Sequence, residues 1–232
     1  MSNVVLIRPG CTDFDEQNRI SGDLNLPMND RGQGQVDEVL AALRESEFGV
    51  IYCDPTEPAR TTAGSVAEDH GVRVKERDEL RNMDHGLWQG LQLEDIKRKF
   101  PKVYKQWKDA PETICPPEGE PFPEALARIK KFLKKPLKKE TPFAIVASEP
   151  LATLIQCVIE GRKPALPTNG GINSEVRVQF LTINEFENCE EGAAPRNGES
   201  TNGKAASDKK ASNGKASANG SSDSSNPSKA NS

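Results

Sequence analysis

The chain has 232 residues, a formal charge of −4 at pH 7 and an apolar fraction of 34%, which is low for a globular protein. This acidic balance is a poor match for nucleic acid, and no apolar run approaches the ~20 residues that a membrane-spanning helix needs. The N-terminus shows no secretory signal pattern. We therefore expect a cytoplasmic protein with neither nucleic acid nor membrane as a partner.

The shortage of apolar residues is concentrated at the C-terminal end. From about Gly192 onward the chain has no aromatic residue and no Leu, Ile, Val or Met, so this segment cannot bury enough surface to offset the entropy of ordering. We predict one folded domain over residues 1–190 and a low-complexity, disordered tail over residues 191–232. From Gly192 the tail has six Lys and Arg against three Asp and Glu, about +3, which leaves about −7 for the rest of the chain.

Apolar runs alternate with amphipathic segments through the first 190 residues. Strands are predicted at Val4–Ile7, Gly49–Cys53, Val72–Val74, Phe143–Val146 and Val176–Ile183. Helices are predicted at Gln33–Glu45, Glu57–Asp69, Leu93–Phe100, Val103–Lys108, Glu124–Leu137 and Pro150–Ile159. Polar loops are predicted at Thr12–Pro27 and Leu80–Gly90. The order of elements indicates an α/β fold, a three-layer sandwich with a mostly parallel central sheet and helices on both faces.

The first strand ends at an arginine. Arg8 follows Val4–Ile7 and precedes the turn pair Pro9-Gly10. Ligands bind at the carboxyl ends of strands in open α/β sheets, and a guanidinium matches two oxygens of an anion such as phosphate. Arg8 is therefore a candidate ligand-binding residue, the alternative being a purely structural ion-pair partner.

Several stretches resemble the histidine phosphatase superfamily, which includes the cofactor-dependent phosphoglycerate mutases. The family's first strand ends Arg-His-Gly, and here it ends Arg8-Pro9-Gly10. Further similar stretches follow in the family's order at Thr12, Arg19–Asn29, Cys53–Ala63, Leu80–Gly90, Pro117–Arg128 and Val146–Pro150. The resemblance covers nearly the whole domain, and it implies a phosphoglycerate mutase-like fold with phosphatase or phosphomutase chemistry.

The departures from the family pattern fall on the positions that carry the chemistry. By this resemblance, Pro9 replaces the nucleophilic histidine, Glu149 the second pocket histidine, Pro58 the pocket arginine, Asn82 the proton-donating carboxylate and Asp15 the pocket asparagine. Of the central pocket set only Arg8 matches. Proline has no side-chain nitrogen to accept a phosphoryl group, and an asparagine cannot donate a carboxylic proton.

The replacements also change the expected field of the pocket. A carboxylate ~4 Å from a phosphate charge costs roughly 4 kcal/mol at an effective dielectric constant of ~20. Asp15 and Glu149 therefore predict an anionic pocket that disfavours phosphate. We expect one of these two carboxylates to pair with Arg8 and occupy the position of the phosphate.

Three residues are candidates to rescue activity. Cys11 is a candidate nucleophile, with an unreactive loop thiol as the alternative. Arg60 is a candidate replacement for the missing arginine, although its place on the helix points it elsewhere. His85, with two carboxylates, is a candidate weak metal site, the alternative being a histidine in an aromatic slot. The five cysteines contain no Cys-x-x-Cys and there are only two histidines, so we expect no metal and no cofactor.

The sequence thus favours a catalytically inactive, histidine-phosphatase-like protein, a pseudoenzyme that binds an unidentified protein partner or small ligand. The alternative is a phosphomonoesterase or phosphoglycerate mutase-like enzyme with a rearranged active site. A third hypothesis is a sensor that binds a cationic ligand in an acidic pocket. The oligomeric state is left open.

Overall fold

The computed structural model describes residues 3–139, 141–167 and 177–183. Within them, one sheet has the strand order β3-β2-β4-β1-β5. Its strands are β1 Asn3–Ile7, β2 Val50–Cys53, β3 Arg73–Glu76, β4 Phe143–Val146 and β5 Val178–Thr182. Strands β1 to β4 pair parallel, whereas β5 pairs antiparallel with β1 at the edge of the sheet. The predicted tail lies outside the described residues.

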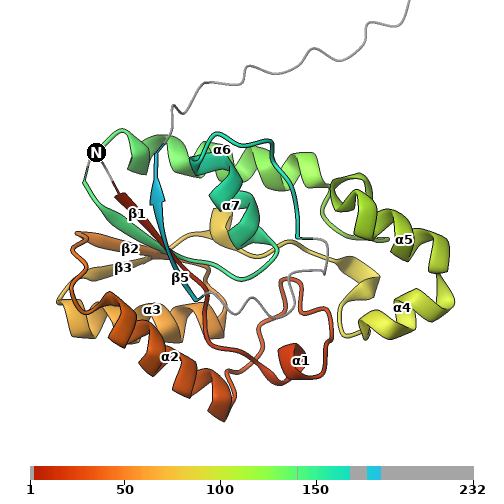
Figure 1. Ribbon diagram of the computed structural model, residues 1–232, viewed down its shortest axis with the longest axis horizontal. Helices are drawn as coiled ribbons and strands as arrows, with labels where there is room; N and C mark the ends of the chain where they lie inside the picture. Colours follow the sequence, from red (N-terminus) through yellow and green to blue (C-terminus); the bar gives the residue numbers. More distant parts are fainter. Residues whose placement is uncertain (1–2, 140, 168–176, 184–232) are drawn as a thin grey trace, which may run out of the picture. The chain divides into compact units, whose positions relative to one another are not determined.

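Helices cover both faces of this sheet (Figure 1). They are α1 Asp13–Glu16, α2 Asp30–Leu43, α3 Glu57–His70, α4 Leu93–Lys99, α5 Pro101–Asp109, α6 Phe122–Leu137 and α7 Leu151–Ile159. Single 3-10 turns lie at Asp78–Leu80, Gly86–Trp88 and Pro111–Thr113. The predicted α/β architecture with a mostly parallel sheet is therefore confirmed.

The core divides into two layers because side chains alternate along a strand. Val4 and Leu6 of β1 pack with the apolar side chains of α6 and α7, including Ile129 and Leu154. Val5 and Ile7 face the opposite side, where they pack with α2 and α3. A third cluster, around Ile20, Trp88, Ile96 and Trp107, joins α4 and α5 to the loops beside the carboxyl ends of the strands.

Several local features differ from the sequence expectation, among them strand β3, which spans Arg73–Glu76 rather than Val72–Val74. The segment Thr12–Pro27, predicted as a loop, contains the short helix α1, which has no buried residue and therefore no apolar pattern to reveal it. Helix α2 begins at Asp30 rather than Gln33, because the Asn29 side chain caps it by accepting the Gly32 N–H at 2.9 Å. In the part of the chain that is described, no helix combines the length and apolar content that crossing a lipid bilayer demands.

Candidate functional site

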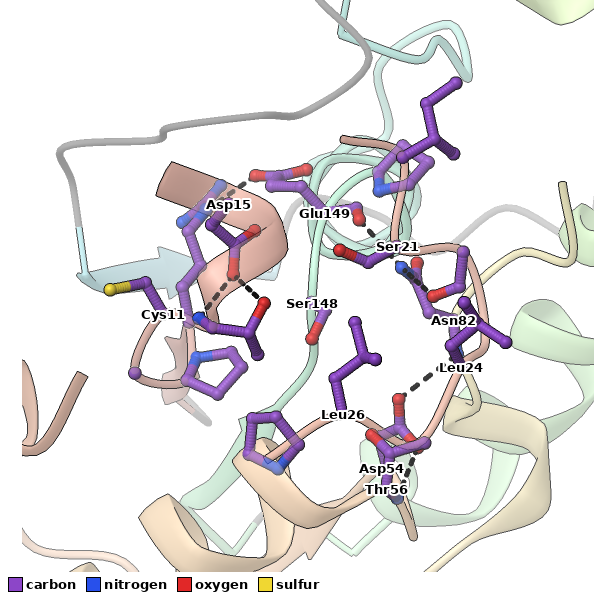
Figure 2. A pocket seen from close by; sticks show the side chains of 18 of the residues that line it. Cys11, Asp15, Ser21, Leu24, Leu26, Asp54, Thr56, Asn82, Ser148 and Glu149 are labelled. Carbon is purple, nitrogen blue, oxygen red and sulfur yellow. Dashed lines mark hydrogen bonds and ion pairs between the residues drawn. The ribbon is translucent and has the colours of Figure 1, made fainter. Parts of the chain in front are cut away.

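A pocket opens at the carboxyl ends of β1, β2 and β4, and loops and helix starts from distant parts of the chain complete it. The candidate residues that line it are Arg8, Pro9, Cys11, Asp15, Pro58, Asn82, His85 and Glu149. Arg60 is not among the lining residues and its side chain is exposed. Figure 2 shows Asp15 on one side, Asn82, Asp54 and Thr56 on the other, and Ser148 and Glu149 between them.

Arg8 is occupied by partners within the chain. Its Nε donates to Oε1 of Glu149 at 2.6 Å, and its Nη1 donates to Oε1 of Gln179 at 2.7 Å. The side chains of Arg8 and Glu149 are only 6% and 8% exposed, and Oε2 of Glu149 accepts the Thr153 N–H at 3.1 Å in the first turn of α7. Of the two carboxylates expected to pair with Arg8, the structure pairs Glu149.

Asp15 has a different partner. One of its carboxylate oxygens accepts both the backbone N–H of Thr12, at 2.7 Å, and the Thr12 hydroxyl, at 2.8 Å. This is the arrangement of a helix N-terminus, where a carboxylate in the first turn satisfies a free N–H. Asp15 therefore fixes the start of α1 rather than binding Arg8.

The loop after β1 leaves no room for larger side chains. A Cβ on Gly10 would lie 2.4 Å from the Gly32 carbonyl oxygen and 2.7 Å from Sδ of Met28. The loop is held against the start of α2 through its backbone, because the Cys11 N–H donates to the Gln35 side chain at 2.9 Å. Pro9, which precedes these two residues, lines the pocket.

Arg177 is a pocket residue that the sequence analysis missed. Its carbonyl accepts the Arg8 N–H at 2.8 Å, and its Nη1 donates to the Pro9 carbonyl at 3.0 Å. Burial lowers the pKa of its guanidinium, an effect that nearby Cys11 and Asp15 oppose. Strand β5 pairs antiparallel with β1, so it starts beside the end of β1. A prediction of this strand direction from the sequence would have placed Arg177 at the pocket.

Asn82 connects three segments in the wall of the pocket. Its Nδ2 donates to the carbonyls of Gly22, at 2.9 Å, and Glu149, at 2.8 Å, while its Oδ1 accepts the Leu151 N–H at 3.4 Å. Its backbone N–H donates to the buried carboxylate of Asp54 at 3.2 Å. Burial raises the pKa of Asp54, and the hydrogen bonds from Thr56 and Asn82 oppose that rise. Each polar atom of the Asn82 side chain is therefore used in holding the fold.

The two remaining rescue candidates lie in the pocket wall. The Cys11 thiol is buried and donates to Oδ1 of Asn29 at 3.3 Å, and burial together with nearby Asp15 raises its pKa, which disfavours the nucleophilic thiolate. The His85 ring is buried, bonds through Nδ1 to the Met83 carbonyl at 3.0 Å and meets the edge of Trp107. Burial lowers the pKa of His85. Over the described residues, no group of three or more His, Cys, Asp or Glu is placed to hold a metal ion.

Formal charges in the pocket lining are balanced rather than acidic. The cations are Arg8, Arg19 and Arg177, and the carboxylates are Asp15, Asp54 and Glu149. Nη1 of Arg19 donates a hydrogen bond to the carbonyl oxygen of Gly90 at 2.6 Å. The prediction of an anionic pocket from Asp15 and Glu149 is therefore wrong, because Arg19 and Arg177 from other segments also line the pocket.

Comparison with known proteins places the chain in a family. The family described as "Histidine phosphatase superfamily (branch 1)" matches residues 4–196. The chain belongs to this superfamily. It is 27% identical over 139 residues to "Phosphoserine phosphatase 1" of Hydrogenobacter thermophilus, a match that covers 60% of this chain and 66% of that protein. It is 28% identical over 130 residues to "Adenosylcobalamin/alpha-ribazole phosphatase" of Salmonella typhimurium, covering 56% of this chain and 64% of that protein.

The structural comparison agrees with this membership at the level of the fold. A mycobacterial glucosyl-3-phosphoglycerate phosphatase, solved with VO3, superposes with a TM-score of 0.66 at 23% identity, over 71% of this chain and 85% of the other. The chain spans slightly less than two thirds of the length of the two curated relatives. Both relatives are named as phosphatases, whereas the activity of this histidine phosphatase superfamily member depends on its own pocket residues.

Proposed function

We propose that this chain is a superfamily member without phosphatase activity, which acts by binding. The observation that carries the proposal is the ion pair between Arg8 and Glu149 at 2.6 Å, with both side chains almost fully buried. A guanidinium stabilises a transferring phosphoryl group only when its N–H groups are directed at the phosphoryl oxygens. Here two of the Arg8 nitrogens already bond to Glu149 and Gln179.

The residues around this ion pair supply neither nucleophile nor acid. Pro9 offers no side-chain nitrogen at the end of β1, and burial raises the pKa of the Cys11 thiol, which disfavours its nucleophilic thiolate form. Asn82 has no acidic proton, and its amide is committed to Gly22, Glu149 and Leu151. By the resemblance to the family, Pro9 and Asn82 stand at the positions of the nucleophile and of the proton donor.

A second candidate function is a phosphomonoesterase with a rearranged site. It is favoured by the relatives that are named phosphatases and by Arg19 and Arg177, which bring positive charge into the pocket. In this alternative Arg177 takes over part of the anion binding, and Glu149 has to move away from Arg8 to admit a phosphate.

Hydrolysis of a generic aryl phosphate by the purified chain separates the two functions. We expect a rate equal to that of the buffer, and no phosphorylated protein by intact-mass spectrometry. The matched control restores the residues that the family carries, with Pro9→His, Asp15→Asn, Pro58→Arg, Asn82→Glu and Glu149→His together in a chain shown to be folded by circular dichroism. Turnover by the unmodified chain that disappears in Arg8→Gln would establish the phosphomonoesterase instead.

A further inference from the structure

Six lysines are gathered at the C-terminal end of α6. They lie within ten residues, at Lys130, Lys131, Lys134, Lys135, Lys138 and Lys139, and we call them the lysine face. Five of the six side chains are exposed and Lys130 is half-buried. This segment contrasts with the rest of residues 1–191, whose formal charge is about −7 with the lysines included.

The spacing of these lysines places them on one side of the helix. Lys130, Lys131, Lys134 and Lys135 lie within α6, and at about 100° per residue they fall within one half of the helix circumference, whereas Lys138 and Lys139 directly follow its last residue. The other half carries the buried side chains, which are Ala125, Ile129, Phe132, Leu133 and Pro136. Because that half packs into the core, the lysine face is directed outward, and α6 forms the outer layer on its side of the sheet (Figure 1).

The charges of the lysine face are not neutralised by the described part of the protein. No acidic residue occurs between Ala125 and Lys139, and none of the ion pairs among the described residues involves these six lysines. Helix α4, also rich in basic residues, differs in that Lys97 pairs with Glu94 and Arg98 with Asp95. Within the described residues, the lysine face is therefore a positive surface without ion-pair partners.

Helix stability does not account for this arrangement. Lys134 and Lys135 lie in the last turn, where they interact favourably with the helix dipole. Lys130 and Lys131 lie before that turn, and like charges four residues apart, such as Lys130 with Lys134, destabilise a helix. The repulsion between these lysines does not stabilise the helix, and the rest of the domain is acidic. We therefore look for the role of these lysines in an interaction with a partner.

We propose that the lysine face adsorbs to an anionic phospholipid surface. The face has lysines only, so it lacks both the forked arginines that bind single phosphates and the aromatic rings on which bases of nucleic acids stack. A group of four to eight basic residues on an amphipathic helix is typical of attachment to anionic lipid, and a flat bilayer meets one face while the acidic remainder points away. The net charge of the chain does not reveal this membrane partner, because it sums the basic lysine face with the acidic remainder of the domain.

The buried apolar half of α6 fixes the mode of attachment. Ile129 and Leu133 are fully buried in the core and cannot enter the lipid without unfolding the domain. Adsorption is therefore electrostatic, without insertion of apolar side chains. Such attachment weakens as salt shortens the Debye length, and this inference does not depend on whether the pocket is catalytic.

Co-sedimentation of the full chain with vesicles tests the proposal. We expect at least ~10-fold tighter binding to phosphatidylcholine vesicles that contain phosphatidylserine than to pure phosphatidylcholine, and loss of this binding between about 0.05 and about 0.5 M salt. The variant Lys131→Gln/Lys134→Gln/Lys138→Gln should lose at least ~10-fold in affinity for the anionic vesicles. The matched control Lys102→Gln/Lys105→Gln/Lys108→Gln removes three exposed lysines from α5 and should bind like the unmodified chain.

Three results would overturn the proposal. The first is absence of binding to the phosphatidylserine vesicles at low salt. The second is an equal loss in the two triple variants, which would mean that net charge matters and the lysine face does not; the C-terminal tail is the same in both. The third is tighter binding to a single-stranded RNA homopolymer than to the vesicles, which would assign the lysine face to another polyanion.

Discussion

The strand-end pocket and the lysine face treat charge in opposite ways. In the pocket, Arg8 and Glu149 are each other's partners, and the Asp15 carboxylate is bonded to Thr12. On the lysine face, six cations have no ion-pair partner among the described residues. A buried charge must be paired inside the protein because water cannot reach it, whereas an exposed charge is solvated at little cost. The polar groups of the pocket therefore bond to one another within the fold, whereas the charges of the lysine face are available to a partner.

Substitution of Glu149 by alanine should give the largest effect and tests the first half of this comparison. It leaves the guanidinium of Arg8 buried without a counter-charge, and we expect a loss of about 3–5 kcal/mol in the free energy of unfolding. Urea denaturation measures this loss. The double variant Arg8→Met/Glu149→Leu should recover most of it, and a double variant as unstable as Glu149→Ala would show that packing, rather than the charge, was lost.

Asn82→Ala should give the next largest effect. It removes the side-chain hydrogen bonds to Gly22, Glu149 and Leu151 and leaves buried backbone groups unpaired, which we expect to cost about 2–3 kcal/mol. Urea denaturation of Asn82→Ala alongside Thr113→Ala, an exposed residue, measures the difference. Equal stability of the two variants would contradict the role of Asn82 in connecting the segments of the pocket wall.

The pH dependence of stability should report on His85. Burial lowers the pKa of the native imidazole, opposed by the Met83 carbonyl and by Asp84, Asp23 and Glu120, so the unfolded chain takes up the proton more readily. The contribution of His85 is fully present above its unfolded pKa of about 6.5, and it is lost as the pH falls below that value. We expect the melting temperature to decrease between about pH 7 and about pH 5, and to decrease less in His85→Phe. Parallel profiles for the two proteins would remove His85 as the cause.

The smallest effect should come from the lysine face. The variant Lys131→Gln/Lys134→Gln/Lys138→Gln should change the free energy of unfolding by less than about 0.5 kcal/mol, or raise it slightly, because it relieves repulsion between exposed like charges. Chemical denaturation beside the Lys102→Gln/Lys105→Gln/Lys108→Gln control gives the comparison. A loss above about 2 kcal/mol would mean that these lysines stabilise the fold, and the contrast with the pocket would no longer hold.

Features that leave an apolar pattern in the sequence were predicted correctly, whereas features set by individual hydrogen bonds were not. The buried strand Phe143–Val146 is observed with the bounds that its apolar run predicts, because burial on both faces leaves a continuous apolar pattern. The short helix α1 has no such pattern, since it is set by the bonds of Asp15 to Thr12. The roles of the proposed pocket residues remain a prediction. The structure places most of these residues around one opening.

By itself, the sequence determined the fold class and the position of Arg8 directly after β1, because apolar periodicity is a local property. Only the tertiary structure decided that Glu149 rather than Asp15 pairs with Arg8, and that Arg177 enters the pocket from the start of β5. These outcomes depend on distances between residues more than 140 positions apart in the chain. The position of such partners is fixed by the pairing of strands, which no single stretch of sequence encodes.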